Sequence, residues 1–115
     1  MKIIVQRVRE SSVSVNGELV SSIGRGLMVL LGLTHTDDFS DTFHLGSKLL
    51  RLRLWPDEKE KPWDKSVLDN DFEVLVVSQF TLYHVLKGNK PDFHNAMEHE
   101  KARELYEEFI TFLRD

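Results

Sequence analysis

Two hydroxyls and an amide directly follow a run of apolar residues, and these side chains are the best suited to chemistry in the sequence. Residues 74–77 predict a buried strand, and Ser78, Gln79 and Thr81 lie at its carboxyl end. A threonine hydroxyl is a weak nucleophile unless a neighbouring base removes its proton. Residues 78–82 contain no histidine, lysine or carboxylate, so the base would be the substrate itself or a residue brought near by folding. Residue types alone favour the alternative that Ser78 and Thr81 bond to neighbouring backbone.

The next segment combines cations with an aromatic ring. Residues 87–91 read Lys-Gly-Asn-Lys-Pro, which predicts a loop whose two ammonium groups could meet phosphate or simply be solvated. Phe93 could stack on a nucleic-acid base, which is worth about 1–3 kcal/mol per base, or it could anchor the loop in the core. Arg7 lies among apolar residues of the first strand, and a surface position is expected for it unless a specific acceptor holds it.

Metal and cofactor chemistry find little support in the residue types. The chain has no cysteine, and its histidines have no paired-ligand spacing: they are His35, His44, His84, His94 and His99. Residues 24–26, Gly-Arg-Gly, are followed by a strand pattern rather than by a helix that could hold phosphate. We therefore expect neither a metal site nor a cofactor.

Length and charge predict a single domain over residues 1–115. The net charge of -4, with both signs interspersed, provides no general attraction for nucleic acid, so any such contact must be local. The longest apolar run, residues 27–31, is far too short to span a membrane. The amino terminus shows no secretory signal, and the absence of cysteine fits a reducing compartment, so we expect a cytoplasmic protein without membrane association.

The first third of the chain predicts a β-meander. Residues 2–8 and 12–15 are rich in β-branched residues, and Asn16-Gly17 is typical of a tight hairpin turn before a return strand at 18–23. Residues 27–31 predict an interior strand that is buried on both faces.

The remainder predicts helices separated by strands. Asp37 or Asp38 can cap a helix, and the strict alternation of residues 50–54 predicts a strand after it. Residues 63–70 show no clear period, and a strand follows at 73–77. The clearest amphipathic helix contains Ala102, Leu105, Tyr106, Phe109, Ile110 and Leu113. This order indicates an α+β fold with a largely antiparallel or mixed sheet.

Several segments, in matching order and spacing along the whole chain, closely resemble the D-aminoacyl-tRNA deacylases, also called D-tyrosyl-tRNA deacylases. They are residues 6–8, 12–17, 23–27, 29–32, 52–55, 78–82 and 87–94, and residues 63–67 look most like eukaryotic members. The resemblance implies a barrel-like sheet with two packed helices. It also implies a homodimeric proofreading hydrolase, which cleaves the ester between the terminal adenosine of tRNA and a D-amino acid, or glycine mischarged on tRNA-Ala.

The resemblance also implies roles for particular residues. Residues 78–82, which are Ser78, Gln79, Phe80, Thr81 and Leu82, would line the aminoacyl pocket, with the backbone of Gln79 and Phe80 near the ester carbonyl. Two mechanisms are known for the family, one with Thr81 as nucleophile and one in which the terminal ribose hydroxyl of the RNA is activated. The lack of a base in this segment favours the second. Near the terminal adenosine would lie Lys87, Pro91, Phe93, Ala96 and Met97, while Arg7 would hold an element that crosses between subunits.

One feature of the family has no counterpart here. Family members continue past the last helix into strands that carry a Gly-Pro dipeptide, which enters the partner's pocket and excludes L-amino acids. None of Pro56, Pro62 and Pro91 follows a glycine. We therefore expect this sequence to be a truncated form of a longer protein. The alternative function is a nonenzymatic nucleic-acid-binding or dimerisation module with the same fold.

Overall fold

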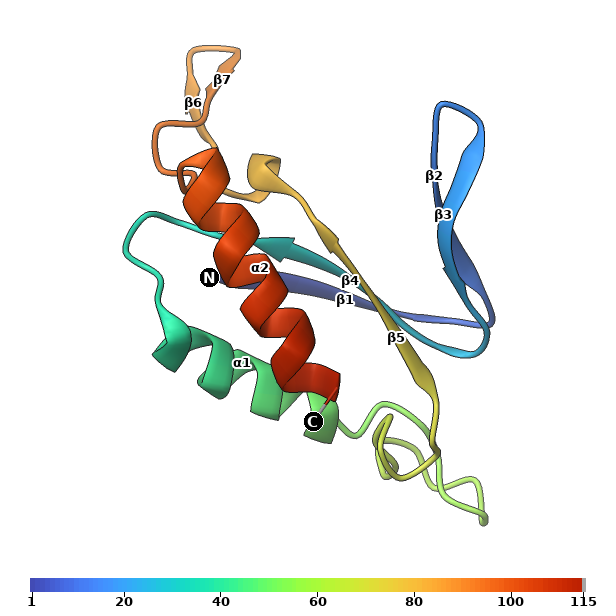
Figure 1. Cartoon of the computed structure of the whole chain (residues 1–115). Coiled ribbons are helices and arrows are strands. Elements are labelled where there is room, and N and C mark those ends of the chain that lie inside the picture. Colours follow the sequence, from blue (N-terminus) through green and yellow to red (C-terminus); the bar gives the residue numbers. More distant parts are fainter. Residues whose placement is uncertain (115) are drawn as a thin grey trace.

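A three-stranded mixed sheet forms the centre of the molecule (Figure 1). The computed structural model describes residues 1–114. β1 (Lys2–Val8) and β4 (Gly26–Gly32) pair antiparallel, and β5 (Glu73–Ser78) pairs parallel to β4, with Leu31 opposite Ser78. β4 lies between its two neighbours and is largely buried on both faces, which confirms the predicted interior strand.

Two hairpins extend from this sheet. β2 (Ser11–Val15) and β3 (Glu18–Ile23) are joined through Asn16 and Gly17, whose φ angles of 51° and 83° are the positive values that a primed turn requires. The predicted hairpin is thus confirmed, and it stands away from the central sheet in Figure 1. The second hairpin joins β6 (Val85–Lys87) to β7 (Lys90–Asp92). Within residues 1–114 the three sheets do not join into a closed barrel, whereas the α+β class is confirmed.

The helix α1 (Phe39–Arg51) begins where the acidic residues predict it. Asp38 is the N-cap: its carboxylate accepts from the Ser40 amide at 2.9 Å, and the Asp41 carboxylate accepts from the Asp38 amide in return. Asp37 has a different role, because its carboxylate accepts hydrogen bonds from the chain's terminal ammonium at 2.7 Å and from the Thr34 amide at 2.8 Å.

The predicted strand at residues 50–54 is wrong. The helix continues to Arg51, and residues 52–54 belong to no strand; the Leu54 amide donates to the Lys65 carbonyl at 3.0 Å, and Trp55 forms an isolated bridge with Lys65. Leu52 and Leu54 are still half-buried while Arg53 is exposed. The alternation therefore reports which side chains are buried, and it does not require the backbone to join a sheet.

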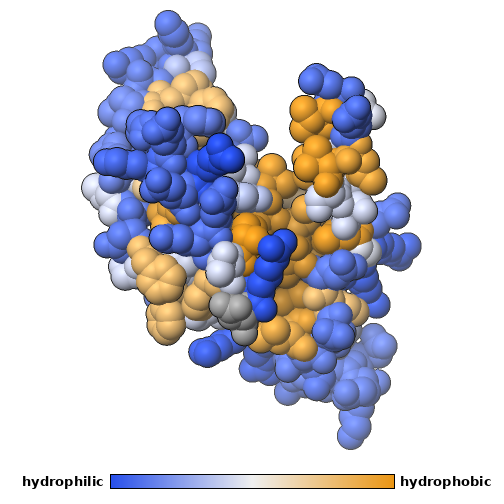
Figure 2. All heavy atoms as spheres, viewed as in Figure 1, coloured by the Kyte–Doolittle hydropathy of each residue, from blue (hydrophilic) through white to orange (hydrophobic). Residues whose placement is uncertain are grey.

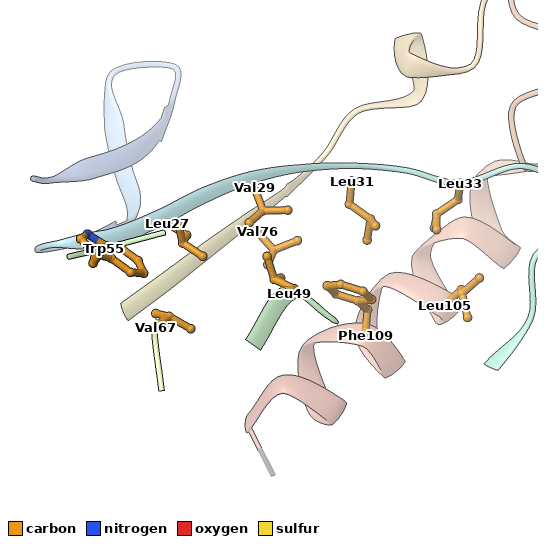
Figure 3. Close-up of a cluster of buried hydrophobic side chains, with 10 residues drawn as sticks. All are labelled: Leu27, Val29, Leu31, Leu33, Leu49, Trp55, Val67, Val76, Leu105 and Phe109. Carbon is orange, nitrogen blue, oxygen red and sulfur yellow. The ribbon is translucent and has the colours of Figure 1, made fainter. Parts of the chain in front are cut away.

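Both helices cover one face of the central sheet and enclose the core. α2 (His99–Arg114) confirms the predicted amphipathic helix, and its Leu105 and Phe109 are buried together with Leu49 of α1. Figure 3 shows these side chains meeting those of β4 and β5, the complete set being Leu27, Val29, Leu31, Leu33, Leu49, Trp55, Val67, Val76, Leu105 and Phe109. Burial of each large apolar side chain stabilises the fold by about 1.5–3 kcal/mol.

An apolar groove of about 880 Å³ lies along β5 between the β2–β3 hairpin and α2. Figure 2 shows apolar side chains exposed in this hollow and on the hairpin. Val20, which lines the groove, is 65% exposed, and the neighbouring Leu19 is 63% exposed. Among the described residues, the edge of β5 away from β4 has no strand partner.

Candidate functional site

The carboxyl end of β5 turns sharply across the end of β4. The Gln79 amide donates to the Leu31 carbonyl at 2.8 Å, and residues Phe80–Leu82 then form a single turn of 3₁₀ helix. The Leu82 side chain packs directly on Gly32, where an added Cβ would lie only 2.7 Å from the Leu82 Cβ. The chain can therefore turn after Ser78, because β4 ends in Gly32, which has no side chain to obstruct the turn.

An aromatic contact joins the two predicted site segments. Phe80 is 57% exposed, and its ring meets that of Phe93 edge-on, with the ring centroids 5.1 Å apart and an interplanar angle of 72°. The structure thus brings residues 78–82 beside residue 93, although the two segments are separate in the sequence.

The segment after Phe93 is fastened to the chain that leaves β4. Thr34 and Ala96 form an isolated antiparallel bridge, the Met97 amide donates to the Leu33 carbonyl at 2.9 Å, and the Thr34 hydroxyl donates to the Asn95 carbonyl. Three segments therefore meet at the carboxyl end of β4: residues 32–34, 78–82 and 93–97. Sequence reasoning missed Gly32 and Thr34, which carry no side chain typical of a site.

Thr81 has no base on its hydroxyl among the described residues. Its side chain is half-buried. The imidazole of His84 is close by, but its Nδ1 donates to the Thr81 backbone carbonyl at 2.8 Å and not to the side chain. A hydroxyl that no base deprotonates is a poor nucleophile.

The two N–H groups that could face an ester carbonyl differ in their bonding. The Gln79 N–H is occupied by the Leu31 carbonyl. The Phe80 N–H belongs to the first turn of a 3₁₀ helix, where backbone donors have no partner within the helix. Of the two, the Phe80 N–H is therefore the one without a hydrogen-bond partner among residues 1–114.

A carboxylate organises the charges of the β6–β7 hairpin. The side chain of Asp92 accepts from Nδ1 of His94, accepts from the His94 amide at 3.2 Å, and lies 3.7 Å from the ammonium of Lys87. The hydrogen bonds from His94, and to a smaller extent the charge of Lys87, hold the pKa of the Asp92 carboxyl below its usual value. Lys87 thus has a partner within the chain, whereas Lys90 and Pro91 are exposed.

Arg7 lies at the opposite end of the central sheet from residues 78–82. It pairs with Leu27, four residues before Leu31, which places it about 13 Å along the strand direction from Ser78. Its guanidinium donates to the Leu54 carbonyl and lies 5.6 Å from the ring centroid of Trp63. Arg7 is exposed, as expected, and a specific acceptor also holds it. The structure does not bring it together with residues 78–82 of the same chain.

The described part of the chain offers neither a cluster of metal ligands nor a membrane-spanning helix. No group of three histidine, aspartate or glutamate residues within residues 1–114 is arranged to hold a metal ion. Neither helix of that range is long and apolar enough to cross a membrane.

Comparison with known families decides the relationship. A family model described as D-Tyr-tRNA(Tyr) deacylase matches residues 4–115, nearly the whole chain. The chain belongs to the D-Tyr-tRNA(Tyr) deacylase family. The resemblance that the sequence motifs indicate is therefore confirmed.

Curated relatives of this family are similar along the full chain. D-aminoacyl-tRNA deacylase 1 of Mus musculus is 54% identical over 114 residues, which are 99% of this chain and 54% of the relative. D-aminoacyl-tRNA deacylase of Drosophila melanogaster is 54% identical over 98% of this chain and 71% of its own length. This chain thus spans about half the length of the mouse relative.

Two solved structures carry the same fold. The "c-Myc DNA Unwinding Element Binding Protein" superposes with a TM-score of 0.94 at 53% identity, covering 99% of this chain and 76% of that one. A probable eukaryotic D-amino acid tRNA deacylase superposes with a TM-score of 0.84 over 97% of this chain and 66% of that one. At 23% identity it shows the fold alone.

Proposed function

We propose that the protein containing this chain hydrolyses the ester bond of D-aminoacyl-tRNA, and of glycyl-tRNA mischarged on tRNA-Ala, in the cytoplasm. Family membership supports this reaction, and the curated relatives bear the corresponding name. The reaction releases the free amino acid and the intact tRNA, and so removes amino acids that must not enter translation.

The observation that carries the proposal is the meeting of three segments at the carboxyl end of β4. The Phe80–Phe93 contact and the Thr34–Ala96 bridge hold residues 78–82 against residues 93–97. In our proposal Ser78, Gln79, Phe80, Thr81 and Leu82 surround the aminoacyl group. The terminal adenosine then lies against the β6–β7 hairpin and residues 93–97, at Lys87, Pro91, Phe93, Ala96 and Met97.

The chemistry in this proposal depends on positioning, because no described residue acts as a base on Thr81. The terminal ribose carries its own hydroxyl beside the ester, and that hydroxyl assists the attack of water on the ester carbonyl. As the tetrahedral intermediate forms, the Phe80 N–H donates to the developing oxyanion, a contact of a kind worth roughly 3–4 kcal/mol in other hydrolases. Collapse of the intermediate breaks the ester bond, and the leaving ribose oxygen takes up the proton.

A second subunit completes the site in this proposal. Arg7 and the cluster at residues 78–82 lie at opposite ends of the central sheet, so one chain cannot use both at one ester. In a homodimer, Arg7 of one protomer would hold an element that reaches the cluster of its partner.

Chain outside this segment supplies further parts of the site. The relatives are longer, and among the described residues β5 has a free edge beside an apolar groove. Exposed strand edges readily pair with another strand. We propose that strands carrying the family's Gly-Pro dipeptide follow α2 and pair along this edge.

A binding module without catalysis is the second candidate. The solved structure at 53% identity is named as a protein that binds a DNA unwinding element, and the exposed Lys90 and Phe80 offer a cation and an aromatic face. In this candidate the same surface binds nucleic acid and the ester is not cleaved.

Release of labelled amino acid separates the two candidates. Residues 1–115 and a form extended to the length of the relatives are each incubated with D-tyrosyl-tRNA and L-tyrosyl-tRNA. The proposal expects the extended form to release D-tyrosine well above the buffer rate and to spare the L-ester. If both forms bind tRNA and neither hydrolyses the D-ester faster than buffer, the binding module is the correct function.

A further inference from the structure

Three aromatic rings form a ridge on the outer surface of the two helices. Phe39 and Phe43, one turn apart on α1, are 53% and 59% exposed. Each meets the ring of Phe112 of α2 edge-on, with centroids 6.4 and 5.8 Å apart. Phe112 is fixed in turn against Gly46, where an added Cβ would lie 2.7 Å from its ring. This phenylalanine ridge is therefore packed on α1 at one ring and presents two large apolar side chains to solvent.

Two hollows of equal size and opposite charge flank the phenylalanine ridge. Each has a volume of about 420 Å³. The acidic hollow is lined by Phe39, Glu104, Glu107, Glu108, Thr111 and Phe112. The basic hollow is lined by Phe43, His44, Ser47, Lys48, Arg51 and Leu52.

The charges of the two hollows are largely unpaired within the chain. Among the ion pairs of residues 1–114, only Arg103–Glu107, at 3.5 Å, involves the acidic hollow, and none involves Lys48 or Arg51. Four charged side chains around an exposed aromatic ridge are thus available to a partner, namely Glu104, Glu108, Lys48 and Arg51.

We propose that a second copy of this chain docks on the phenylalanine ridge through a two-fold axis. An axis that lies in the interface plane and runs between the two hollows places the acidic hollow of one protomer opposite the basic hollow of the other, and the reverse contact follows by symmetry. The phenylalanine ridges then pack against each other at the centre, where exclusion of water makes aromatic contacts strongest, with the charges at the rim.

The presence of both signs on one surface favours a second copy over other occupants. A basic peptide or a nucleic acid matches only one of the two hollows and meets like charge at the other. A partner must carry both signs on either side of an apolar centre, and the same surface of another protomer satisfies this requirement by symmetry.

This interface does not compete with the proposed catalytic site. The phenylalanine ridge lies on α1 and α2, whereas residues 78–82 and 93–97 lie beyond the ends of the central strands (Figure 1). A dimer that completes the catalytic site and a contact through the phenylalanine ridge can therefore coexist. The proposal holds whether or not the protein is a deacylase.

Sedimentation equilibrium over a wide concentration range tests whether the phenylalanine ridge is an interface. The double variant Phe39→Ser/Phe43→Ser is compared with the wild-type protein, and circular dichroism verifies that the helices remain folded. Loss of two aromatic anchors is expected to weaken the association step that uses the phenylalanine ridge at least about tenfold and to leave any dimer formed at the catalytic site unchanged. Deacylation, if the protein has that activity, is expected to be unchanged. A wild-type protein that associates no more strongly than this variant overturns the proposal.

Charge reversal then tests whether the partner is a second copy. Glu104→Lys/Glu108→Lys and Lys48→Glu/Arg51→Glu each place like charges opposite each other at both rims, so each alone is expected to lose the association through the phenylalanine ridge, while any dimer formed at the catalytic site remains. An equal mixture of the two variants restores opposite charges at both rims and is expected to recover it.

The exposed loop provides the matched control for reversal. Lys59→Glu/Lys61→Glu makes the same change of net charge as Lys48→Glu/Arg51→Glu, but at exposed residues away from the phenylalanine ridge. It is expected to associate like the wild-type protein. Failure of the mixture to recover association, while this control associates normally, overturns a second copy as the occupant.

Discussion

Gly32 is predicted to be indispensable for the turn that carries the candidate site. An alanine there would place its Cβ 2.7 Å from Cβ of Leu82, 3.1 Å from its Cδ1 and 3.3 Å from Cδ2 of Tyr83. The first contact is roughly 0.7 Å short of the ordinary range, and dense packing leaves little room for retreat. The 3₁₀ turn at Phe80–Leu82 must therefore move away from β4.

The added methyl group of Gly32→Ala lowers stability because it overlaps the Cβ of Leu82, which cannot move without its backbone. Overpacking of this kind costs about 1–3 kcal/mol, which in a domain of this size lowers Tm by roughly 4–12 °C. Differential scanning calorimetry of Gly32→Ala measures the loss. Because the moving turn carries Phe80 and Thr81, deacylation by the extended protein is expected to fall more than the stability loss alone explains.

Two further variants test whether the loss of stability in Gly32→Ala comes from the contact with Leu82. Gly24→Ala introduces the same methyl at a position where the nearest atom, Oε1 of Glu73, lies at an ordinary 3.4 Å, so it is expected to be nearly neutral. Leu82→Gly removes the clashing Cβ, so the double variant with Gly32→Ala is expected to lose less than the sum of the single losses. If Gly32→Ala is as stable as Gly24→Ala, the packing of the turn on β4 is not as described.

Three further outcomes are expected. Thr81→Ala retains most turnover, whereas Ala96→Trp blocks substrate binding; a Thr81→Ala protein that binds tRNA normally but is inactive in single-turnover assays contradicts the assignment. Hydrogen bonds from the hydroxyl and amide of Ser40 lower the pKa of the Asp38 carboxyl. The contribution of this cap to stability is therefore complete above the unfolded-state pKa and is lost as pH falls through the lower folded-state pKa. The free energy of unfolding is therefore expected to fall with decreasing pH differently in the wild-type protein and in Asp38→Asn, and the same pH dependence in both would count against the cap. Tyr106→Phe removes the 2.8 Å hydrogen bond to the Val76 carbonyl and is expected to cost about 0.5–1.5 kcal/mol in urea unfolding, against no cost if that bond is unimportant.

Local patterns predict those elements whose structure depends on nearby residues. The turn at Asn16-Gly17, the cap at Asp38 and the amphipathic face of α2 are all visible in the sequence, because each needs only a few residues close along the chain. The interior position of β4 is visible because all of its residues are apolar or glycine.

Other features depend on contacts between distant residues. Residues 50–54 alternate as a strand does, yet no neighbouring strand among the described residues is available to pair with them, and only the fold decides that. The contact of Arg7 with the Leu54 carbonyl and Trp63 likewise joins separate segments. The pairing of Asp92 with His94 is an exception with a local origin, since an aspartate side chain readily accepts from the backbone amide two residues on.

The candidate site likewise has a part that the sequence predicts and a part that only the fold decides. Residues 78–82 stand out in the sequence because polar side chains follow an apolar strand, and family resemblance adds residues 93–97. Their contact through Phe80 and Phe93, and their attachment to Thr34, are set by the end of β4 and have no local signal.

Single-turnover release of amino acid from D-tyrosyl-tRNA and L-tyrosyl-tRNA tests the central claim most directly. The protein extended to the length of its relatives is used in excess, beside its Ala96→Trp variant. We predict rapid release from the D-ester, release from the L-ester at the buffer rate, and loss of D-ester cleavage in the variant. Equal rates for the D-ester and buffer, or a fully active Ala96→Trp protein, would contradict the account.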